Sequence, residues 1–251
     1  PDVAKIAFTG STTTGQAIAS RAALRSARVT LEMGGKSPQI VFDDADLDQA
    51  VNGVMAGIFA ATGQSCMAGS RVLVEAPVFD AVCALLSERG RRMIAGDPLD
   101  PASQLGPLAS RAQLDKLLAY FAIAREEGLD CVTGGHRLDR QGYFVAPTLY
   151  RDVPPASRIA REEIFGPVAA LIRFDGEEEA VRIANDTRYG LAAGIWTEDL
   201  RRAHRMLHHI RAGTIWVNNY RVIGHTLPFG GYGQSGIGRE MGAQALDGYS
   251  E

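Results

Sequence analysis

The feature of this 251-residue chain that most constrains its fold is the alternation of short strand-like segments with longer helix-like segments. The pattern predicts strands at residues 5–9, 28–32, 39–42, 71–75, 168–174, 192–196 and 214–217. It predicts helices at 14–24, 78–94, 111–127, 177–185 and 199–209, with one more that runs to Ala61 and is capped by Asp44 or Asp46. Such alternation is typical of an α/β fold with a mostly parallel sheet, because parallel strands need crossover connections.

Composition narrows the class of protein further. With 46% hydrophobic and 22% charged residues, the chain can form one large domain or two small ones. The 26 basic and 29 acidic side chains give a net charge of −3, which argues against a nucleic-acid partner. No run of about 18 apolar residues is present, so no membrane span is predicted.

Cysteine usage and the first residues carry expectations about location and length. Three scattered cysteines are too few for a disulfide framework or a zinc site, so we expect a reducing, cytoplasmic location and no metal. The chain opens with Pro1 rather than with an initiator methionine, which suggests a piece of a longer protein.

Cys66 lies in a segment of small residues, Gly63 to Gly69. Such surroundings leave room for a substrate, and the flanking amides can stabilise a thiolate or an oxyanion, so Cys66 is a candidate nucleophile. From the residues alone, a buried and inert thiol is the commoner interpretation of a lone cysteine. Cys83, on a helical face, and Cys131, in a strand, are interpreted as buried and inert.

Two further features stand at predicted strand ends. Glu32 closes a strand just before Gly34 and Gly35, where open α/β sheets place ligands, so it is a candidate general base. A salt-bridged surface acid is the alternative. The turn Gly10–Gly15 leads from a strand into a helix, where free N–H groups suit a phosphate, although a plain turn is also possible.

Other polar groups are interpreted more simply. Glu163 and Phe165 precede a predicted strand. They can be a turn with a packed ring, or an acid and an aromatic ring that contact the nicotinamide ribose of a cofactor. Three histidines share one helix but lack a further metal ligand, so they are expected to be a solvated face: His204, His208 and His209. Two arginine pairs are expected to be surface charge: Arg91-Arg92 and Arg201-Arg202.

Taken in order, five motifs closely resemble the NAD(P)-dependent aldehyde dehydrogenase superfamily over nearly the whole chain. They are Phe8-Thr9-Gly10-Ser11, Leu31-Glu32-Met33-Gly34-Gly35-Lys36-Ser37-Pro38, Gly63-Gln64-Ser65-Cys66 with Ala68-Gly69-Ser70-Arg71, Glu163-Ile164-Phe165-Gly166-Pro167, and Pro228-Phe229-Gly230-Gly231 with Ser235-Gly236-Ile237-Gly238-Arg239-Glu240.

The resemblance implies a role for each matching residue. Cys66 matches the nucleophile, Glu32 the general base, and Glu240 an acid on the proton-relay side. The cofactor, NAD or NADP, would be held by residues of the pyrophosphate turn and the nicotinamide ribose site: Gly10, Ser11, Gly15, Gln113, Lys116, Glu163 and Phe165. Phe229 matches an aromatic residue of the aldehyde tunnel, and the implied partner is a small-molecule aldehyde.

The resemblance also implies an architecture. We expect the last β-α-β unit of a Rossmann-type cofactor domain at about 1–34, a three-layer catalytic domain at about 35–234 and a returning segment at 235–251. Family members are roughly twice as long and form homo-oligomers, so the chain looks truncated at both ends. The family's asparagine oxyanion donor and its adenosine contacts fall outside this sequence, and Gly233 stands where many relatives have lysine.

Three alternatives remain open at this point. Some relatives pass the acyl group to coenzyme A, although Glu32 favours water as the acceptor. The chain could be an inert fragment, since an oxyanion donor and the adenosine contacts are missing. A thiol hydrolase that uses Cys66 lacks a convincing histidine partner.

Overall fold

A seven-stranded sheet forms the centre of the computed structural model, which describes residues 2–250. Its order is β5-β6-β7-β4-β3-β8-β9, and only β5 runs antiparallel to its neighbour. Four predicted strands of this sheet are confirmed to the residue: β4 (Arg71–Glu75), β7 (Val168–Phe174), β8 (Ala192–Trp196) and β9 (Thr214–Val217). The mostly parallel sheet is therefore confirmed, with β3 (Pro38–Val41) beginning one residue earlier than expected.

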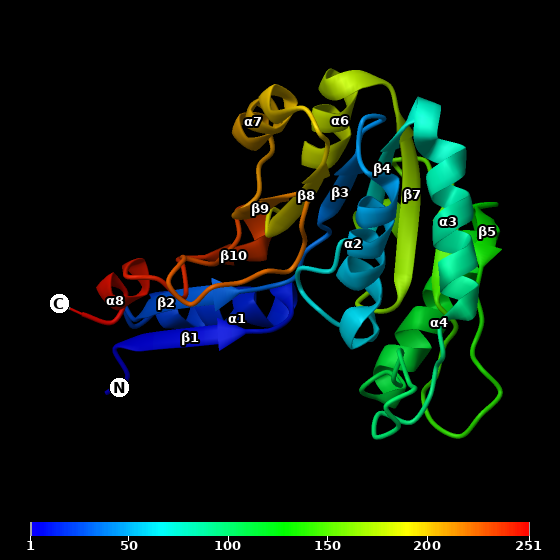
Figure 1. The fold of residues 1–251 in the computed structure, drawn as a ribbon. Coiled ribbons are helices and arrows are strands. Elements are labelled where there is room, and N and C mark those ends of the chain that lie inside the picture. Colours follow the sequence, from blue (N-terminus) through cyan, green and yellow to red (C-terminus); the bar gives the residue numbers. More distant parts are fainter. Residues whose placement is uncertain (1, 251) are drawn as a thin grey trace.

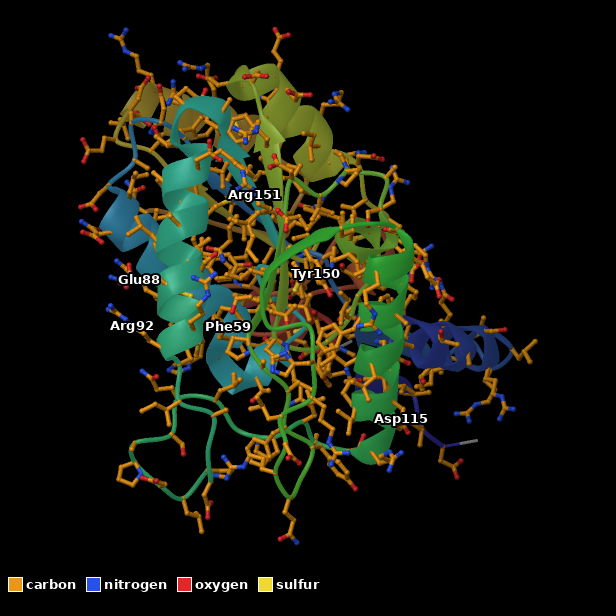
Figure 2. The ribbon with its side chains drawn as sticks, turned by 90° about the vertical axis from the view of Figure 1, so that its right-hand side faces the viewer. Phe59, Glu88, Arg92, Asp115, Tyr150 and Arg151 are labelled. Carbon is orange, nitrogen blue, oxygen red and sulfur yellow. The ribbon has the colours of Figure 1, made fainter. Side chains whose placement is uncertain are left out.

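Helices cover both faces of this sheet, so the three-layer prediction is also confirmed. On one side lie α2 (Leu47–Phe59) and α3 (Phe79–Arg92), and on the other α4 (Arg111–Glu126), α5 (Arg158–Arg161), α6 (Gly176–Asn185) and α7 (Leu200–His209). Figure 2 shows α3 and α4 on opposite sides of the strands, with Glu88 and Arg92 of α3 turned outward. Successive strand residues alternate between the two cores: Val72 and Val74 face α2 and α3, whereas Leu73 faces α4.

A second, smaller sheet lies beside the first (Figure 1). In it β1 (Lys5–Thr9) pairs in parallel with β2 (Arg28–Glu32), and α1 (Thr12–Ala23) connects them. The short β10 (Gly236–Ile237) then returns antiparallel to β2, with Gly236 opposite Glu32. The unit has the β-α-β form expected for the first residues; the exact domain boundaries remain a prediction.

Several predictions about individual elements need correction. The pattern missed β6 (Thr148–Arg151), the short α8 (Gln244–Asp247) and the 3-10 turns η1 (Ala60–Gly63), η2 (Ala76–Val78) and η3 (Gly233–Ser235). Cys131 lies in β5 (Asp130–Thr133) as expected, but it is exposed rather than buried, because β5 is the edge strand of the large sheet. Cys83 is buried and the three histidines of α7 are exposed, as predicted.

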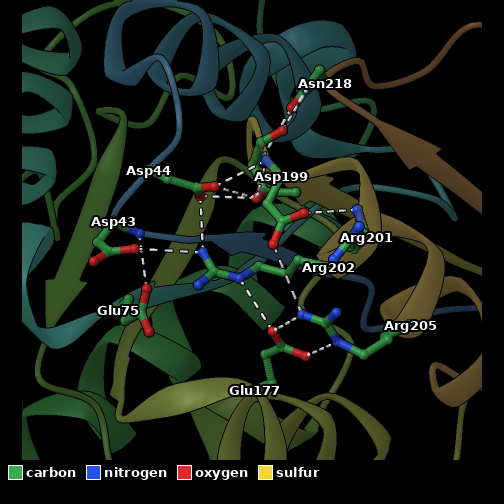
Figure 3. Close-up of polar contacts among 10 residues, drawn as sticks. Asp43, Asp44, Glu75, Glu177, Asp199, Arg201, Arg202, Arg205 and Asn218 are labelled. Atoms are coloured by element: carbon green, nitrogen blue, oxygen red, sulfur yellow. Dashed lines mark hydrogen bonds and ion pairs between the residues drawn. The ribbon is translucent and has the colours of Figure 1, made fainter.

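The carboxyl edge of the large sheet is closed by ion pairs rather than left open (Figure 3). Arg202 lies within 2.9 Å of Asp44 and 3.3 Å of Glu177, and its guanidinium stacks over Phe42. Arg202 is therefore the centre of a network and not the free surface charge that was predicted. Asp44 is engaged here, and it is Asp46 that caps α2 by accepting from the Gln49 amide.

Among residues 2–250, no helix has both the length and the hydropathy that a bilayer span requires. The same range holds no cluster of histidine, cysteine and acidic side chains suited to a metal ion.

Candidate active site

A pocket of about 550 Å³ lies between the small sheet and the amino edge of the large sheet. Its volume falls in the usual range for a small-molecule or cofactor site. Eight of the eleven predicted site residues line it: Gly10, Ser11, Glu32, Cys66, Gln113, Lys116, Glu163 and Phe165. The structure thus brings together residues that are far apart in the sequence; Gly10 and Phe165 are separated by 155 positions.

The loop that carries Cys66 begins with a left-handed turn. Ala61, Thr62 and Gly63 have φ values of 53°, 58° and 67°, a conformation that side-chain-bearing residues rarely adopt. The turn is held by two bonds to the segment before α4. The Gln64 side-chain oxygen accepts from the Ala109 amide over 2.8 Å, and the Thr62 hydroxyl donates to the Gly106 carbonyl oxygen over 3.2 Å.

Glycines allow this loop to pack closely on its neighbours. A Cβ atom at Gly63 would lie 2.1 Å from the Gly166 carbonyl oxygen, and one at Gly35 would lie 2.5 Å from the Cys66 carbonyl oxygen. Gly63 also needs its positive φ, so a side chain there would be both strained and obstructed. The thiol loop is therefore in contact with the Glu163 loop and with the segment after Glu32.

Electrostatics keep the Cys66 thiol protonated at rest. Burial is the largest influence and raises its pKa, and the carboxylates of Glu163 and Glu32 raise it further. The Met67 amide opposes them by favouring the thiolate. Only a small fraction of the thiol is therefore ionised at neutral pH.

Glu32 has the properties of a general base. Neither of its buried carboxylate oxygens has a hydrogen-bond partner within the described residues. Burial raises the pKa of Glu32 to about 7; Arg239 acts against this rise and Glu240 adds to it. A Cβ atom at Gly230 would lie 2.7 Å from the Glu32 carboxylate, so the loop before β10 closes over the group and keeps it dry.

Glu163 lines the same pocket beside Gly34 and Gly35. Its carboxylate accepts from the Gly35 amide over 3.2 Å, and a Cβ atom at Gly34 would lie 2.1 Å from its second oxygen. Burial raises the pKa of Glu163, whereas the Gly35 bond and the positive charges of Lys116 and Lys36 lower it. The second carboxylate oxygen is thus available to a ligand that enters beside Gly34.

Gln113 makes a connection that the resemblance did not suggest. Its side-chain amide donates to the carbonyl oxygens of Ile164 (2.9 Å) and Phe165 (2.7 Å). Both amide hydrogens are used within the protein, so only the side-chain oxygen remains for a cofactor. Phe165 has a φ of 61°, and the bonds from Gln113 hold this strained turn in place.

The predicted pyrophosphate turn begins α1. The Ser11 hydroxyl caps the helix by accepting from the Thr14 amide over 3.2 Å. Gly15 does not line the pocket; instead it lets α1 approach Met33, whose sulfur would lie 2.3 Å from a Cβ atom at that position. Phe229 and Glu240 also lie outside the pocket lining, and their backbones pair over 2.7 and 2.8 Å.

Three site residues had no predicted role. Gln64 anchors the thiol loop, Arg239 places a positive charge near Glu32, and Lys36 lies buried behind Glu163. The Lys36 amine has no hydrogen-bond partner in the described chain, and burial lowers its pKa to about 7, with Arg71 adding to the effect. All three stand in motifs that were recognised, but nothing in the local sequence shows what their side chains touch.

Comparisons with known proteins agree with this arrangement. The model of the aldehyde dehydrogenase family matches residues 1–251. The chain is 49% identical to a betaine aldehyde dehydrogenase of Sinorhizobium fredii and 48% identical to betaine aldehyde dehydrogenase 1 of Rhizobium meliloti, in each case over 100% of this chain and 52% of the relative. It therefore spans about half the length of the relatives it matches.

Solved structures give the same result. The NAD+ complex of an aldehyde dehydrogenase from Bacillus cereus superposes with a TM-score of 0.98 at 44% identity, over 100% of this chain and 51% of that one. Betaine aldehyde dehydrogenase from Staphylococcus aureus, also solved with NAD+, superposes with a TM-score of 0.96 at 38% identity, over 98% of this chain and 50% of that one. With the family model matched along its whole length, this chain belongs to the aldehyde dehydrogenase family.

Proposed function

We propose that this chain carries the catalytic centre of an NAD(P)-dependent dehydrogenase that oxidises an aldehyde to a carboxylic acid through Cys66. The observation that carries the proposal is the convergence of Cys66, Glu32 and Glu163 on one pocket. A dry carboxylate with a pKa of about 7 is suited to taking a proton from water near neutrality.

The residues support a two-stage reaction on the thiol. The Cys66 thiol loses its proton to solvent, and the thiolate, which the Met67 amide favours, adds to the aldehyde carbon to give a thiohemiacetal. The Cys66 backbone N–H is one donor for the resulting oxyanion. Once the carbon is oxidised to a thioester, Glu32 takes a proton from water, which attacks the carbonyl and releases the acid.

The pocket also suits a nicotinamide cofactor, which when bound supplies the hydride acceptor for the oxidation. The free oxygen of Glu163, the side-chain oxygen of Gln113 and the Lys116 amine would bind ribose hydroxyls. The amide groups at the start of α1 offer a site for phosphate. Because Gly34 has no side chain, the Glu163 carboxylate can lie directly against it at the pocket wall.

Trapping the thioester tests the proposal. Incubation of the Glu32→Gln variant with NAD and a panel of aldehydes should add an acyl group to Cys66, detected by intact-mass and peptide mass spectrometry. The Cys66→Ala variant should gain no such mass, and the Cys83→Ala variant should behave like its parent. Absence of any acyl adduct, together with absence of NADH, would leave the inert-fragment alternative in place.

A further inference from the structure

The segment between β9 and β10 lies against the thiol loop from outside the cofactor pocket. The Tyr220 hydroxyl donates to the Met67 carbonyl oxygen over 2.8 Å, one residue after Cys66. The Arg221 guanidinium lies 3.5 Å from the Ala60 carbonyl oxygen, where the thiol loop begins. These two contacts flank Cys66 and place Arg221 at a side of the loop that Glu32 and Glu163 do not occupy.

The position of Arg221 is fixed by its backbone and its neighbour. Its φ of 69° is a strained conformation for a residue with a side chain. Tyr220 is buried, and its ring packs on Trp216 with 4.7 Å between centroids. Arg221 thus extends from a rigid support rather than from a mobile loop.

The charge of Arg221 is not neutralised. No carboxylate pairs with it within the described residues. The sequence holds no aspartate or glutamate from residue 200 to residue 239, so the whole segment that borders the thiol on this side is neutral or cationic. An approaching molecule therefore meets an unopposed positive charge.

The same segment is poorly suited to a cationic substrate. Quaternary ammonium groups are recognised by open aromatic faces or by acids. Trp216 and Tyr220 are buried against each other, and the exposed Tyr232 already has the Arg239 guanidinium over its ring at 4.8 Å. Similarity to enzymes named for betaine aldehyde, which carries such a group, therefore does not fix the substrate of this chain.

We infer that Arg221 is a specificity-determining residue that favours aldehydes with a carboxylate or another anionic group at the far end and disfavours cationic aldehydes. The inference rests on the proposed function, because it assumes that aldehydes reach Cys66 past this segment. The effect of the Arg221 charge on molecules that approach Cys66 can be measured without enzyme turnover.

Charged thiol reagents provide the measurement. Rates of Cys66 modification are compared for the anionic sulfonatoethyl and the cationic trimethylammonioethyl methanethiosulfonates, with peptide mass spectrometry separating Cys66 from the exposed Cys131. The anionic-to-cationic rate ratio should fall by about 5-fold or more in Arg221→Gln. It should be largely kept in Arg221→Lys and unchanged in the control Arg201→Gln, whose side chain is exposed on α7. The difference in this rate ratio between the parent and Arg221→Gln should shrink as the salt concentration is raised.

An unchanged ratio in a folded Arg221→Gln protein would overturn the inference, whatever the dehydrogenase activity. If Arg221→Gln fails to fold, Arg221→Met and Arg221→Lys form the comparison, and equal ratios in these two would overturn it as well. In enzyme that turns over, Arg221→Gln should lower kcat/KM for a carboxylate-bearing semialdehyde and raise it for betaine aldehyde. Complete loss of NADH formation with all aldehydes would instead count against the proposed function.

Discussion

The side-chain nitrogen of Gln113 lies 2.7 Å from the carbonyl oxygen of Phe165. Four residues before Gln113, the Ala109 amide donates to the side chain of Gln64. The start of α4 therefore connects two strained turns, one beside Cys66 and one beside Glu163. This connection sets the separation between the nucleophile and the carboxylate that is proposed to bind the cofactor.

Gln113→Glu should weaken cofactor binding by about tenfold or more. A carboxylate cannot donate to the Ile164 and Phe165 carbonyls, so the Phe165 turn loses its support. The free energy of unfolding should fall by about 1–3 kcal/mol, as for lost hydrogen bonds to buried groups. Calorimetric titration with NADH and urea unfolding check both effects. The control is Gln16→Glu on the exposed face of α1, and equal losses in the two variants would refute the special role of Gln113.

Cys66→Ala should abolish aldehyde oxidation and any esterase activity while the fold is retained. The thiol is only half-buried in a loop of small residues, so little packing is lost. Circular dichroism and product assays check this expectation. Cys83→Ala and Cys131→Ala serve as controls and should keep the activity of the parent; activity in Cys66→Ala would show that another nucleophile operates.

Glu32→Gln should block release of the acid. The amide keeps the shape of the side chain but accepts no proton, so hydrolysis of the thioester should slow by about 10²–10⁴-fold. Stopped-flow measurement should show a burst of NADH followed by a stall. In the parent, the hydrolysis rate should rise with pH through about 7 as Glu32 ionises. A steady rate equal to that of the parent would make Glu32 a structural acid only.

The same substitution has a pH-dependent effect on stability. The pKa of Glu32 is raised in the folded protein from 4.5 to about 7, so its charge disfavours folding as pH rises through this interval. Below pH 4.5 both states are protonated and the effect vanishes. Glu32→Gln should therefore gain stability relative to the parent at pH 8 but not at pH 4, as measured by urea unfolding at the two pH values.

Gly34→Ala should disturb the cofactor site without unfolding the protein. The added methyl group would lie 2.1 Å from a Glu163 oxygen, so the Glu163 side chain must move and its bond to Gly35 must weaken. NADH affinity should fall while the melting temperature changes little. The matched control is Gly106→Ala, where the nearest atom is 3.7 Å away; similar affinity losses in both would mean that the close approach at Gly34 is unimportant.

Lys36→Met should stabilise the fold at pH 7. In the folded protein burial lowers the pKa of Lys36 from 10.5 to about 7, so the unfolded chain binds more protons between these values. The parent should gain stability as pH rises from 7 toward 10, and the advantage of the variant should shrink over the same range. At pH 7 the advantage should be about 4 kcal/mol. A difference that does not change with pH would show that packing, not charge, is responsible.

The sequence by itself determined the elements that depend on local residue pattern. The segment 168–174 is a run of apolar residues that ends in turn residues, and it forms β7 to the residue. The glycine-rich setting of Cys66 and the acid at the end of β2 were visible for the same reason, since small residues and strand ends are properties of short segments. For the cap of α2, the sequence offered two neighbouring residues, Asp44 and Asp46, and the structure uses Asp46.

Tertiary structure decided which edges and partners these residues meet. Glu32 ends β2, whereas Cys66 and Glu163 precede β4 and β7, so the site joins the carboxyl edge of the small sheet to the amino edge of the large one. The carboxyl edge of the large sheet, where open α/β sheets usually bind ligands, is filled by the network around Arg202. Sheet order, burial of Lys36 and exposure of Cys131 follow from contacts between distant segments, and such contacts leave no trace in the spacing of neighbouring residues.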